Sequence, residues 1–477
     1  MTEGKPLATP NQKRLVELGM VLTVILVAWS LRLARLPFLT MWSDEYHSVR
    51  ISSLPLAAIL SGNNTGDLNP PLYSALLRLQ RLTFGDTEIA MRSLSLAFAM
   101  LSMPLFFKLA QGILREFIPS IAALVLMAFH PMFIYYSLEI RPYSLLILFG
   151  LLSFLSCVNV QGESKRSQAW AILLALSLAG CMYAHHFGII VPIAISIFMA
   201  INIVLIKKWS KSERLSLLSI AIAGILYLPG LLMFRTQALS YPVGGYLTPL
   251  TTSLQVFVFS LDHPPYEQLL AATAITAFVL GMMVLITQIR NIPAVSLMIS
   301  GIATGIASAV LATLVGVNIM SRYLIVVLPF ALTAMAATLT AKNRAWHRLI
   351  KGIGVITIAL YMVYGISFVL NTQRENQQVD WKADWKQLSA VIGNLRITGE
   401  PIVIVGWGGS PLEYYLAETT LSSAEMEQQL LLHHHPSYLI VMTPYAKTMP
   451  IMGSVTLLYE DDSEGLRVLR LRTPSER

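Results

Sequence analysis

Long apolar runs separated by short polar connectors dominate the first three quarters of this sequence. Their length fits membrane-spanning helices, each of which needs about 20 mostly apolar residues. The pattern predicts about eleven spans, at residues 15–36, 88–109, 119–137, 143–160, 169–184, 187–206, 215–233, 267–289, 294–316, 323–341 and 352–371. The sequence therefore predicts a polytopic α-helical membrane protein.

The pattern changes after residue 371. Amphipathic stretches at 381–395 and 410–418 predict helices, and apolar stretches at 400–407 and 436–443 predict buried strands. We therefore expect two domains, a transmembrane domain at 1–371 and a small extracytoplasmic α/β domain at 372–477.

The first long connector, residues 37–87, also shows helical periodicity. Between residues 71 and 82, four leucines fall on one stripe while the arginines lie off it: Leu72, Leu76, Leu79 and Leu82. Such a helix is suited to lie along the membrane surface. A second helix is predicted in "HSVRISSLPLAAIL", interrupted at Pro55.

Composition and charge support the membrane assignment. The chain has 477 residues, of which 55% are hydrophobic and only 13% charged, whereas soluble domains carry about 25% charged residues. Most of the net charge of +8 comes from Lys and Arg in alternate connectors. The positive-inside rule then predicts a cytoplasmic N-terminus, and the odd number of spans predicts an extracytoplasmic C-terminal domain. We expect a multi-pass protein of the inner membrane. Because the basic residues fit this topology, we expect no nucleic-acid partner. Cys157 and Cys181 lie inside spans and indicate no disulfide framework.

Ionisable side chains collect at the outer ends of the predicted spans. They are Asp44, Glu45, Glu139, Arg141, His185, His186, Asp262, His263 and Arg322. Such groups are costly at membrane depth and tend to face a shared cavity. The sequence therefore predicts a polar vestibule that opens to the outer side.

The residue types in this vestibule favour one reaction. Arginine binds phosphate through a bidentate fork, and a carboxylate can deprotonate a hydroxyl. Together they fit sugar transfer from a lipid-linked phosphate, whose leaving group needs cations and no protonating acid. We favour Asp44 as the base, with Glu45 orienting it, binding the acceptor or holding a cation.

Each feature also has a purely structural interpretation. Asp44 and Glu45 could be first-turn acids of a helix, and Glu139 with Arg141 could be an exposed turn pair. The histidines could be interfacial, and Arg32, Arg35 and Arg322 could snorkel to the interface instead of binding an anion. The histidines at 433–435 could bind metal or form a polar loop. For the whole protein, the alternatives are a transporter or flippase of lipid-linked sugars and a non-catalytic scaffold.

Six motifs in order resemble one known family. They are "WSDEYHS", "NPPLYSALLRL", "RSLSLAFAM", "LEIRPYSLL", "YAHHFG" and "SRYLIVVLP". They resemble the GT-C membrane glycosyltransferases, and most closely the bacterial dolichyl-phosphate-mannose–protein mannosyltransferase-like group. The C-terminal "DWKQLSAVI…EYYLA" also resembles the extracytoplasmic tail of such proteins.

The resemblance implies an inverting transferase that uses a polyprenyl-phosphate sugar donor and a glycolipid, polysaccharide or protein acceptor. Asp44 matches the family's catalytic acid and Glu45 its usual neighbour. Substrate-binding residues carried over by position are Arg141 and Arg322 for the lipid phosphate, with Glu139, Tyr143, His185, His186, Tyr323 and Asn69. Asn69 stands where the family often has histidine. No metal ligand set is evident, although some branches of the family require a divalent cation.

Overall fold

A computed structural model describes most of the chain. The described residues are 10–62, 69–162, 166–206, 210–238, 265–287, 292–315, 321–342, 346–370, 384–397, 400–405, 411–417, 420–422, 425, 437–442, 454–461 and 466–472. The candidate residues Asp262 and His263 and the histidines at 433–435 lie outside these ranges.

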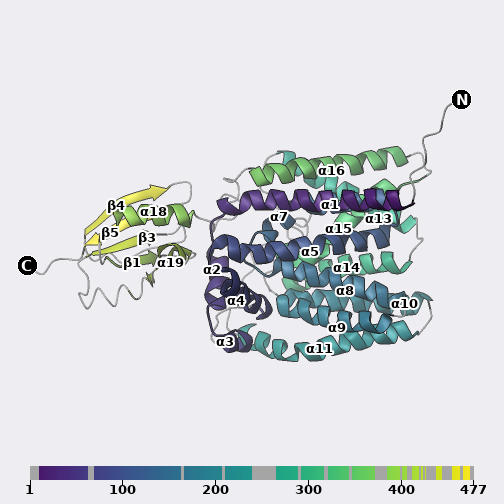
Figure 1. Cartoon of the computed structure of the whole chain (residues 1–477), viewed down its shortest axis with the longest axis horizontal. Coiled ribbons are helices and arrows are strands. Elements are labelled where there is room, and N and C mark those ends of the chain that lie inside the picture. Colours follow the sequence, from purple (N-terminus) through teal and green to yellow (C-terminus); the bar gives the residue numbers. More distant parts are fainter. Residues whose placement is uncertain are drawn as a thin grey trace, which may run out of the picture. The chain divides into compact units, whose positions relative to one another are not determined.

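Helices make up nearly all of the described structure before residue 371 (Figure 1). They are α1 (Pro10–Arg35), α2 (Ser43–Ser52), α3 (Leu56–Ser61), α4 (Leu72–Phe84), α5 (Glu88–Leu114), α6 (Phe117–Phe129), α7 (Pro131–Ser137), α8 (Tyr143–Gln161), α9 (Ser167–Ala184), α10 (Ile190–Ile206), α11 (Lys211–Ala238), α13 (Pro265–Thr287), α14 (Ile292–Val315), α15 (Leu328–Ala337) and α16 (His347–Leu370). Short 3₁₀ helices are η1 (Leu36–Phe38), η2 (His186–Ile189), η3 (Ser321–Val327) and η4 (Thr338–Thr340).

The prediction of a polytopic helical membrane protein is confirmed. Every predicted span corresponds to a helix or to adjoining helices. Among the described residues, nine helices are long and apolar enough to cross a membrane, and the pair α6 and α7, bent by 57°, would be a tenth. The remaining predicted span is α14, whose described apolar stretch Val295–Ser308 is shorter. The structure thus gives nine or ten candidate spans where the sequence predicted about eleven.

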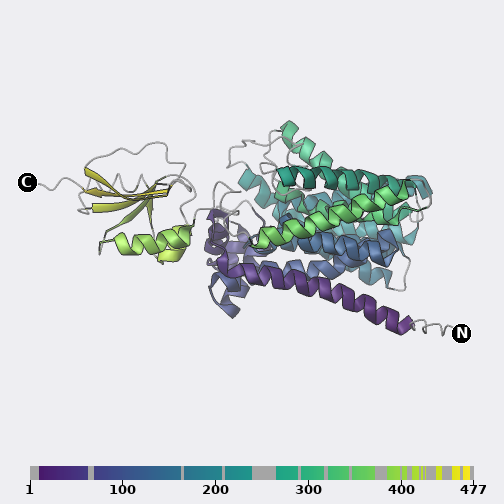
Figure 2. The ribbon, with the colours of Figure 1, turned by 90° about the horizontal axis from the view of Figure 1, so that it is seen from above.

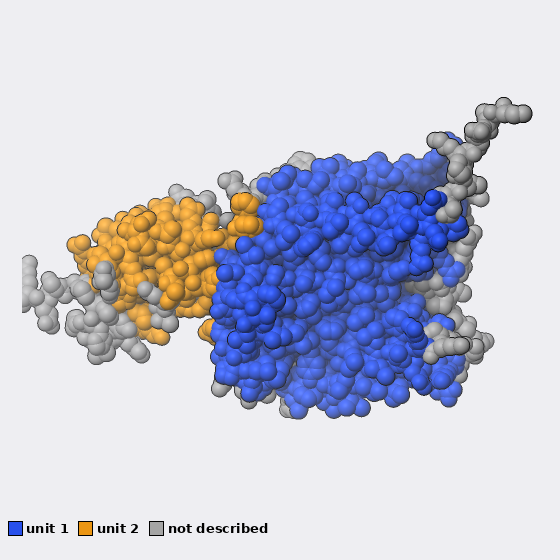
Figure 3. All heavy atoms as spheres, in the orientation of Figure 1, with its two compact units in different colours: residues 1–36, 51–370 blue, residues 37–50, 371–477 orange. Residues whose placement is uncertain are grey.

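The chain forms two compact units, which Figure 3 colours separately. Unit 1 comprises Met1–Leu36 and Ile51–Leu370, and unit 2 comprises Pro37–Arg50 and Asn371–Arg477. The start of the first connector, which we had assigned with the rest of 37–87 to the transmembrane domain, therefore groups with the C-terminal residues. The boundary falls within α2.

Two arginines near the end of α1 cap the carboxyl ends of distant helices. Nη1 of Arg32 donates to the carbonyl of Ala128 in the last turn of α6, at 3.0 Å. Nη1 of Arg35 donates to the carbonyls of Phe368 and Val369 in the last turn of α16, at 3.0 and 2.8 Å. Such terminal carbonyls lack helical partners and attract cations. Both side chains are buried, so the snorkelling interpretation is wrong for them. They tie the end of α1 to α6 and α16, both of which contact it, and Figure 2 shows α1 (purple) and α16 (light green) converging toward this end.

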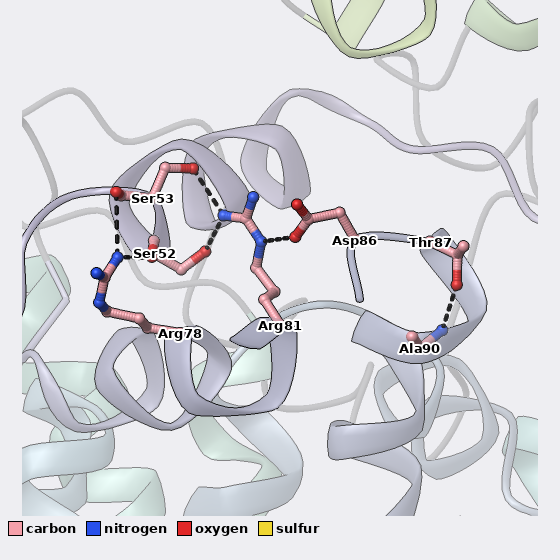
Figure 4. Close-up of polar contacts among 7 residues, drawn as sticks. All are labelled: Ser52, Ser53, Arg78, Arg81, Asp86, Thr87 and Ala90. Carbon is pink, nitrogen blue, oxygen red and sulfur yellow. Dashed lines mark hydrogen bonds and ion pairs between the residues drawn. The ribbon is translucent and has the colours of Figure 1, made fainter. Parts of the chain in front are cut away.

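Helix α4 packs against the end of α2 through two arginines (Figure 4). Nη1 of Arg78 donates to the carbonyls of Ser52 and Ser53 at 3.3 and 3.2 Å. Nη1 of Arg81 donates to the hydroxyls of the same serines at 2.8 and 2.7 Å, and its Nε pairs with Asp86. These bonds fix the later part of the first connector within unit 1.

The other faces of α4 follow the predicted leucine stripe. Leu79 and Leu82 are 62% and 72% exposed, while Tyr73 and Leu77 are buried. The predicted interruption at Pro55 is confirmed, because this residue separates α2 from α3. Helix α4 therefore presents an apolar face outward, as a helix at a membrane surface would.

The C-terminal part of unit 2 is a mixed five-stranded sheet with two helices. Its elements are α18 (Trp385–Leu395), β1 (Ile402–Val405), α19 (Pro411–Leu416), β2 (Leu421–Ser422), β3 (Ser437–Met442), β4 (Ser454–Asp461) and β5 (Leu466–Arg472). The strand order is β2-β1-β3-β5-β4, with β1 parallel to β2 and β3 and with β5 antiparallel to β3 and β4. The α/β prediction is confirmed, although only β1 and β3 of the strands were predicted.

Side chains of β3 alternate between two cores. Leu439 and Val441 pack with Leu388 of α18 and Leu412 of α19, while Ile440 lies in the core on the opposite face. This alternation is the two-residue period of a strand. It places α19 firmly on one face of the sheet.

Candidate functional site

The turn between α7 and α8 is held by contacts from three helices. Ser144 of α8 donates to the carbonyl of Tyr136 at 2.9 Å. Ser95 of α5 donates to the carbonyl of Arg141 at 3.3 Å. Nε of Arg32 donates to the hydroxyl of Ser137 at 2.8 Å. The backbone that carries Glu139 and Arg141 is therefore fixed from several sides.

A tyrosine of α4 extends this support. The Tyr73 hydroxyl and the Ser95 hydroxyl lie 2.8 Å apart. Because Ser95 has one hydroxyl proton, which it donates to the carbonyl of Arg141, Tyr73 donates to Ser95. The "NPPLYS" motif thus acts on the arginine through a relay of two hydroxyls.

Side chains from three distant parts of the chain meet next to this turn. Arg322 of η3 lies 6.0 Å from the Tyr143 ring and 5.7 Å from the Tyr323 ring. The His185 ring lies 5.8 Å from Tyr143 and 5.0 Å from Tyr323. Arg141 and Arg322 both act electrostatically on His185. We name the group the cation–aromatic cluster, whose members are Tyr136, Glu139, Arg141, Tyr143, His185, Arg322 and Tyr323.

The cluster carries more positive than negative charge. It contains the two guanidiniums of Arg141 and Arg322 and the one carboxylate of Glu139, and Tyr136 interacts with both Arg322 and Glu139. Glu139 and Arg141 are only 2% and 7% exposed, so the interpretation as an exposed turn pair is wrong. A buried region with surplus positive charge is suited to an anion.

His185, between the spans of α9 and α10, adds no charge. Burial, then the neighbouring His186 and the cations Arg141 and Arg322, lower the pKa of His185 well below its ordinary value. Its Nδ1 accepts a hydrogen bond from the backbone N–H of Phe187 at 3.1 Å. The imidazole is therefore neutral, with its proton on Nε2.

The glycine of "YAHHFG" explains how this turn closes. A Cβ atom at Gly188 would lie 2.1 Å from the carbonyl oxygen of Cys181 in α9, closer than atoms can approach. Only glycine therefore lets η2 pack this tightly against the end of α9. That packing holds His185 next to the cluster.

Two further predicted site residues, His186 and Asn69, have surroundings of their own. His186 is half-buried, and its Nδ1 lies 2.8 Å from the hydroxyl of Tyr227 in α11. Asn69 lies in the bend that precedes Pro70 and α4, and is half-buried. The structure thus groups Glu139, Arg141, Tyr143, His185, Arg322 and Tyr323 from the predicted set.

The two adjacent acids occupy the first turn of α2, in unit 2. The Glu45 carboxylate is buried, and its Oε2 accepts from the backbone N–H of Trp42 at 3.3 Å. A glutamate that reaches back in this way is half of a capping box. The helix-capping alternative thus describes Glu45. Asp44 is half-buried in the same turn.

Sequence reasoning missed the residues that support the cluster. Tyr136 was recognisable only as the second of two tyrosines next to the "LEIRP" turn, whereas Ser95 and Tyr73 gave no separate signal. For metals, within the part of the chain that the structure describes, no group of three or more His, Cys, Asp or Glu side chains could hold an ion.

Comparisons with known proteins agree with this architecture. Residues 68–232 match the sequence model of a family described as dolichyl-phosphate-mannose-protein mannosyltransferase. This stretch contains Arg141, both histidines and the supporting residues Tyr73 and Ser95. No curated protein matched the chain.

Solved structures share the fold at low sequence identity. ArnT from Cupriavidus metallidurans bound to undecaprenyl phosphate is 15% identical, with a TM-score of 0.59 over 95% of this chain and 98% of that one. Its apo form gives 13% and 0.58, over 95% and 97%. Archaeal AglB from Archaeoglobus fulgidus, in complex with an inhibitory peptide and a dolichol-phosphate, gives 11% and 0.53, over 91% and 70%. The predicted GT-C fold is confirmed.

Proposed function

We propose that this chain, a membrane glycosyltransferase of the dolichyl-phosphate-mannose-protein mannosyltransferase type, moves a sugar from a polyprenyl-phosphate donor to an acceptor hydroxyl. The acceptor belongs to a glycolipid, polysaccharide or protein at the outer face of the inner membrane. The lipid phosphates bound to ArnT and AglB support the donor class.

The observation that carries the proposal is the convergence of Arg141 and Arg322 on one buried imidazole. These arginines lie far apart in the sequence, and the only carboxylate in their cluster is Glu139. A lipid phosphate would supply the missing negative charge and accept hydrogen bonds from both forks. The rings of Tyr143 and Tyr323 lie beside Arg322 and would limit the access of water to these ion pairs, which would strengthen them.

In the reaction, the acceptor hydroxyl gives its proton to the Asp44 carboxylate. Its oxygen forms a bond to the anomeric carbon, and the bond from that carbon to the phosphate oxygen breaks. The electron pair leaves with the polyprenyl phosphate, whose additional charge Arg141 and Arg322 stabilise. Attack opposite the leaving phosphate inverts the anomeric configuration. Because the phosphate leaves without being protonated, one base suffices, whereas a glycosidase uses two carboxyl groups.

The remaining cluster residues orient the substrate in this scheme. Neutral His185 offers one hydrogen bond without competing for the phosphate charge. Tyr136 bonds to Arg322 and interacts with Glu139, so it links this guanidinium to the carboxylate. Outside the cluster, further hydrogen bonds or structural support for the site come from Asn69, His186 and Glu45. With amide chemistry at Asn69, this position carries no titrating group.

The test uses the purified full chain in lipid nanodiscs. It is incubated with a polyprenyl phosphate carrying a radiolabelled sugar and with a cell-envelope extract as acceptor. We expect labelled acceptor and released polyprenyl phosphate in equal amounts, and a product with inverted anomeric configuration. A second assay in proteoliposomes follows intact donor across the bilayer. Transbilayer movement without any covalent product would establish the flippase alternative instead.

A further inference from the structure

We propose that helix α19 positions the acidic first turn of α2, which makes Glu413 and Tyr415 positioning residues for Asp44. The inference rests on the proposed role of Asp44 as base and adds a function for the C-terminal part of the chain. Its starting point is that Pro37–Arg50 form one compact unit with the C-terminal residues.

Two hydrogen bonds join the segments on either side of Asp44. The Tyr46 hydroxyl donates to Oε2 of Glu413 at 2.6 Å. The backbone N–H of Met41 donates to the hydroxyl of Tyr415 at 2.8 Å. Because Met41 precedes Asp44 and Tyr46 follows it, the acid cannot turn about its helix axis unless these contacts break.

Glu413 is itself held firmly. Its other carboxylate oxygen, Oε1, accepts from the backbone N–H of Thr420 at 3.0 Å and from the Thr420 hydroxyl at 2.8 Å. Thr420 directly precedes β2, which pairs with β1. The neighbouring Leu412 is fully buried in the core beneath α18. The sheet therefore fixes the carboxylate that receives the Tyr46 hydroxyl.

The bond to Tyr46 has a fixed direction. Burial, then the hydrogen bond and the charge of Glu413, raise the pKa of Tyr46 above its usual range, against a lowering effect of Arg50. The phenol therefore donates, and the Glu413 carboxylate accepts. Charge-assisted bonds of this kind are roughly twice as strong as neutral ones.

The first turn of α2 is also held by contacts within its own segment. Met41 and Trp42 are 0% and 4% exposed, and Glu45 caps the turn through the N–H of Trp42. The segment thus moves as one piece, and α19 sets its orientation. A displacement of about 1 Å in such a group can cost about 100-fold in rate.

A double-mutant cycle tests the pairing in the nanodisc transfer assay. Tyr46→Phe and Glu413→Ala each remove one side of the bond, and we expect kcat to fall on the order of 10-fold. The double variant should lose no more than either single variant, because both remove the same contact. The donor KM should stay within about two-fold in every case, since the donor-binding arginines are untouched. Glu413→Gln retains one acceptor oxygen and should recover part of the loss.

Matched controls separate positioning from folding. Tyr438→Phe changes another tyrosine of the same unit, and Glu460→Gln changes a carboxylate that pairs with Arg467. Both should keep kcat. Hydrogen exchange of residues 39–47 should accelerate in Glu413→Ala while exchange in α18 stays unchanged. Asp44→Asn, measured in parallel, should abolish transfer.

Three outcomes would overturn the inference. If the losses in kcat are additive, or if kcat is unchanged while Asp44→Asn abolishes transfer, α19 does not position the acid and the proposed function still stands. If Asp44→Asn retains full transfer, the proposed function fails and the inference fails with it.

Discussion

The cation–aromatic cluster and the acidic turn of α2 are held in place by different means. The cluster is built from helix ends of unit 1, and its backbone is fixed by buried hydroxyls, by Arg32 and by the close approach at Gly188. The acidic turn contacts a small α/β fold through two side chains of α19. In the proposed function, binding of the donor and activation of the acceptor thus depend on separate parts of the chain.

This difference predicts that substitutions should separate binding from turnover. Changes in the cluster should raise the donor KM, whereas changes at α19 should lower kcat. The following substitutions test the separation, in order of decreasing effect.

The largest effect is expected at the arginines. Arg141→Ala and Arg322→Ala should each weaken binding of polyprenyl phosphate by about 100-fold or more, because a buried charge pair loses one partner. The lysine variants should be intermediate, since lysine keeps the charge without the fork. Binding is measured with labelled lipid in nanodiscs, with exposed Arg467→Ala as control. If the alanine variants bind polyprenyl phosphate as tightly as the wild type, the cluster does not bind the donor.

Gly188→Ala should disrupt the cluster through its backbone. The added Cβ would overlap the Cys181 carbonyl, so η2 must shift and carry His185 with it. We expect a loss of about 1–3 kcal/mol in stability and a higher donor KM. Gly352→Ala in α16 meets no atom within 4 Å and serves as the control. If stability falls while the donor KM stays normal, the position of η2 does not determine the geometry of the cluster.

The two arginines of α1 should behave differently. Arg35→Met leaves the α16 carbonyls without their cap and should cost about 1–3 kcal/mol in stability, with the donor KM unchanged. Arg32→Met should cost as much and also raise the donor KM, because Arg32 holds Ser137 next to the arginine-bearing turn. Thermal unfolding and donor titration measure the two effects. If both variants have the same donor KM, Arg32 contributes to stability but not to donor binding.

The smallest effect at neutral pH concerns Glu400 in unit 2. Burial raises the pKa of Glu400, but hydrogen bonds from Arg470 and Ser437 outweigh this effect and leave the pKa below its ordinary value. A lowered pKa contributes stability above the unfolded value of about 4.3, and this stability is lost as the pH falls through the folded pKa. Hydrogen exchange in β5 should therefore accelerate below about pH 4, and Glu400→Gln should lose this dependence. Exchange in unit 1 should show no matching step.

Much of the architecture could be predicted because its signals are local. The apolar runs predicted the helices of unit 1, and the apolar stretches "PIVIV" and "YLIV" predicted β1 and β3. Strand β5 was missed because Arg467, Arg470 and Arg472 make its alternation look polar. The break between α6 and α7 falls at Pro131, a residue type that interrupts helices, but the apolar residues on both sides predicted one continuous span.

The contacts that organise the site could not be predicted in this way. Arg32 and Arg35 end the first span in sequence, but their partners lie 96 and 333 residues away. The pairing of Tyr46 with Glu413 likewise joins residues 367 positions apart. The prediction that distant arginines gather rested on the family resemblance and on the count of spans. The hydroxyls that hold these arginines could be identified only from the structure.

The central claim is that Asp44 takes the proton of the acceptor while distant arginines hold the donor phosphate. Its most direct test is the single-turnover rate of sugar transfer from prebound donor, in wild type and in Asp44→Asn, with the exposed Asp86→Asn as control. We predict that Asp44→Asn lowers this rate by about 100-fold or more at unchanged donor affinity, as loss of a general base does. An unchanged rate would contradict the account.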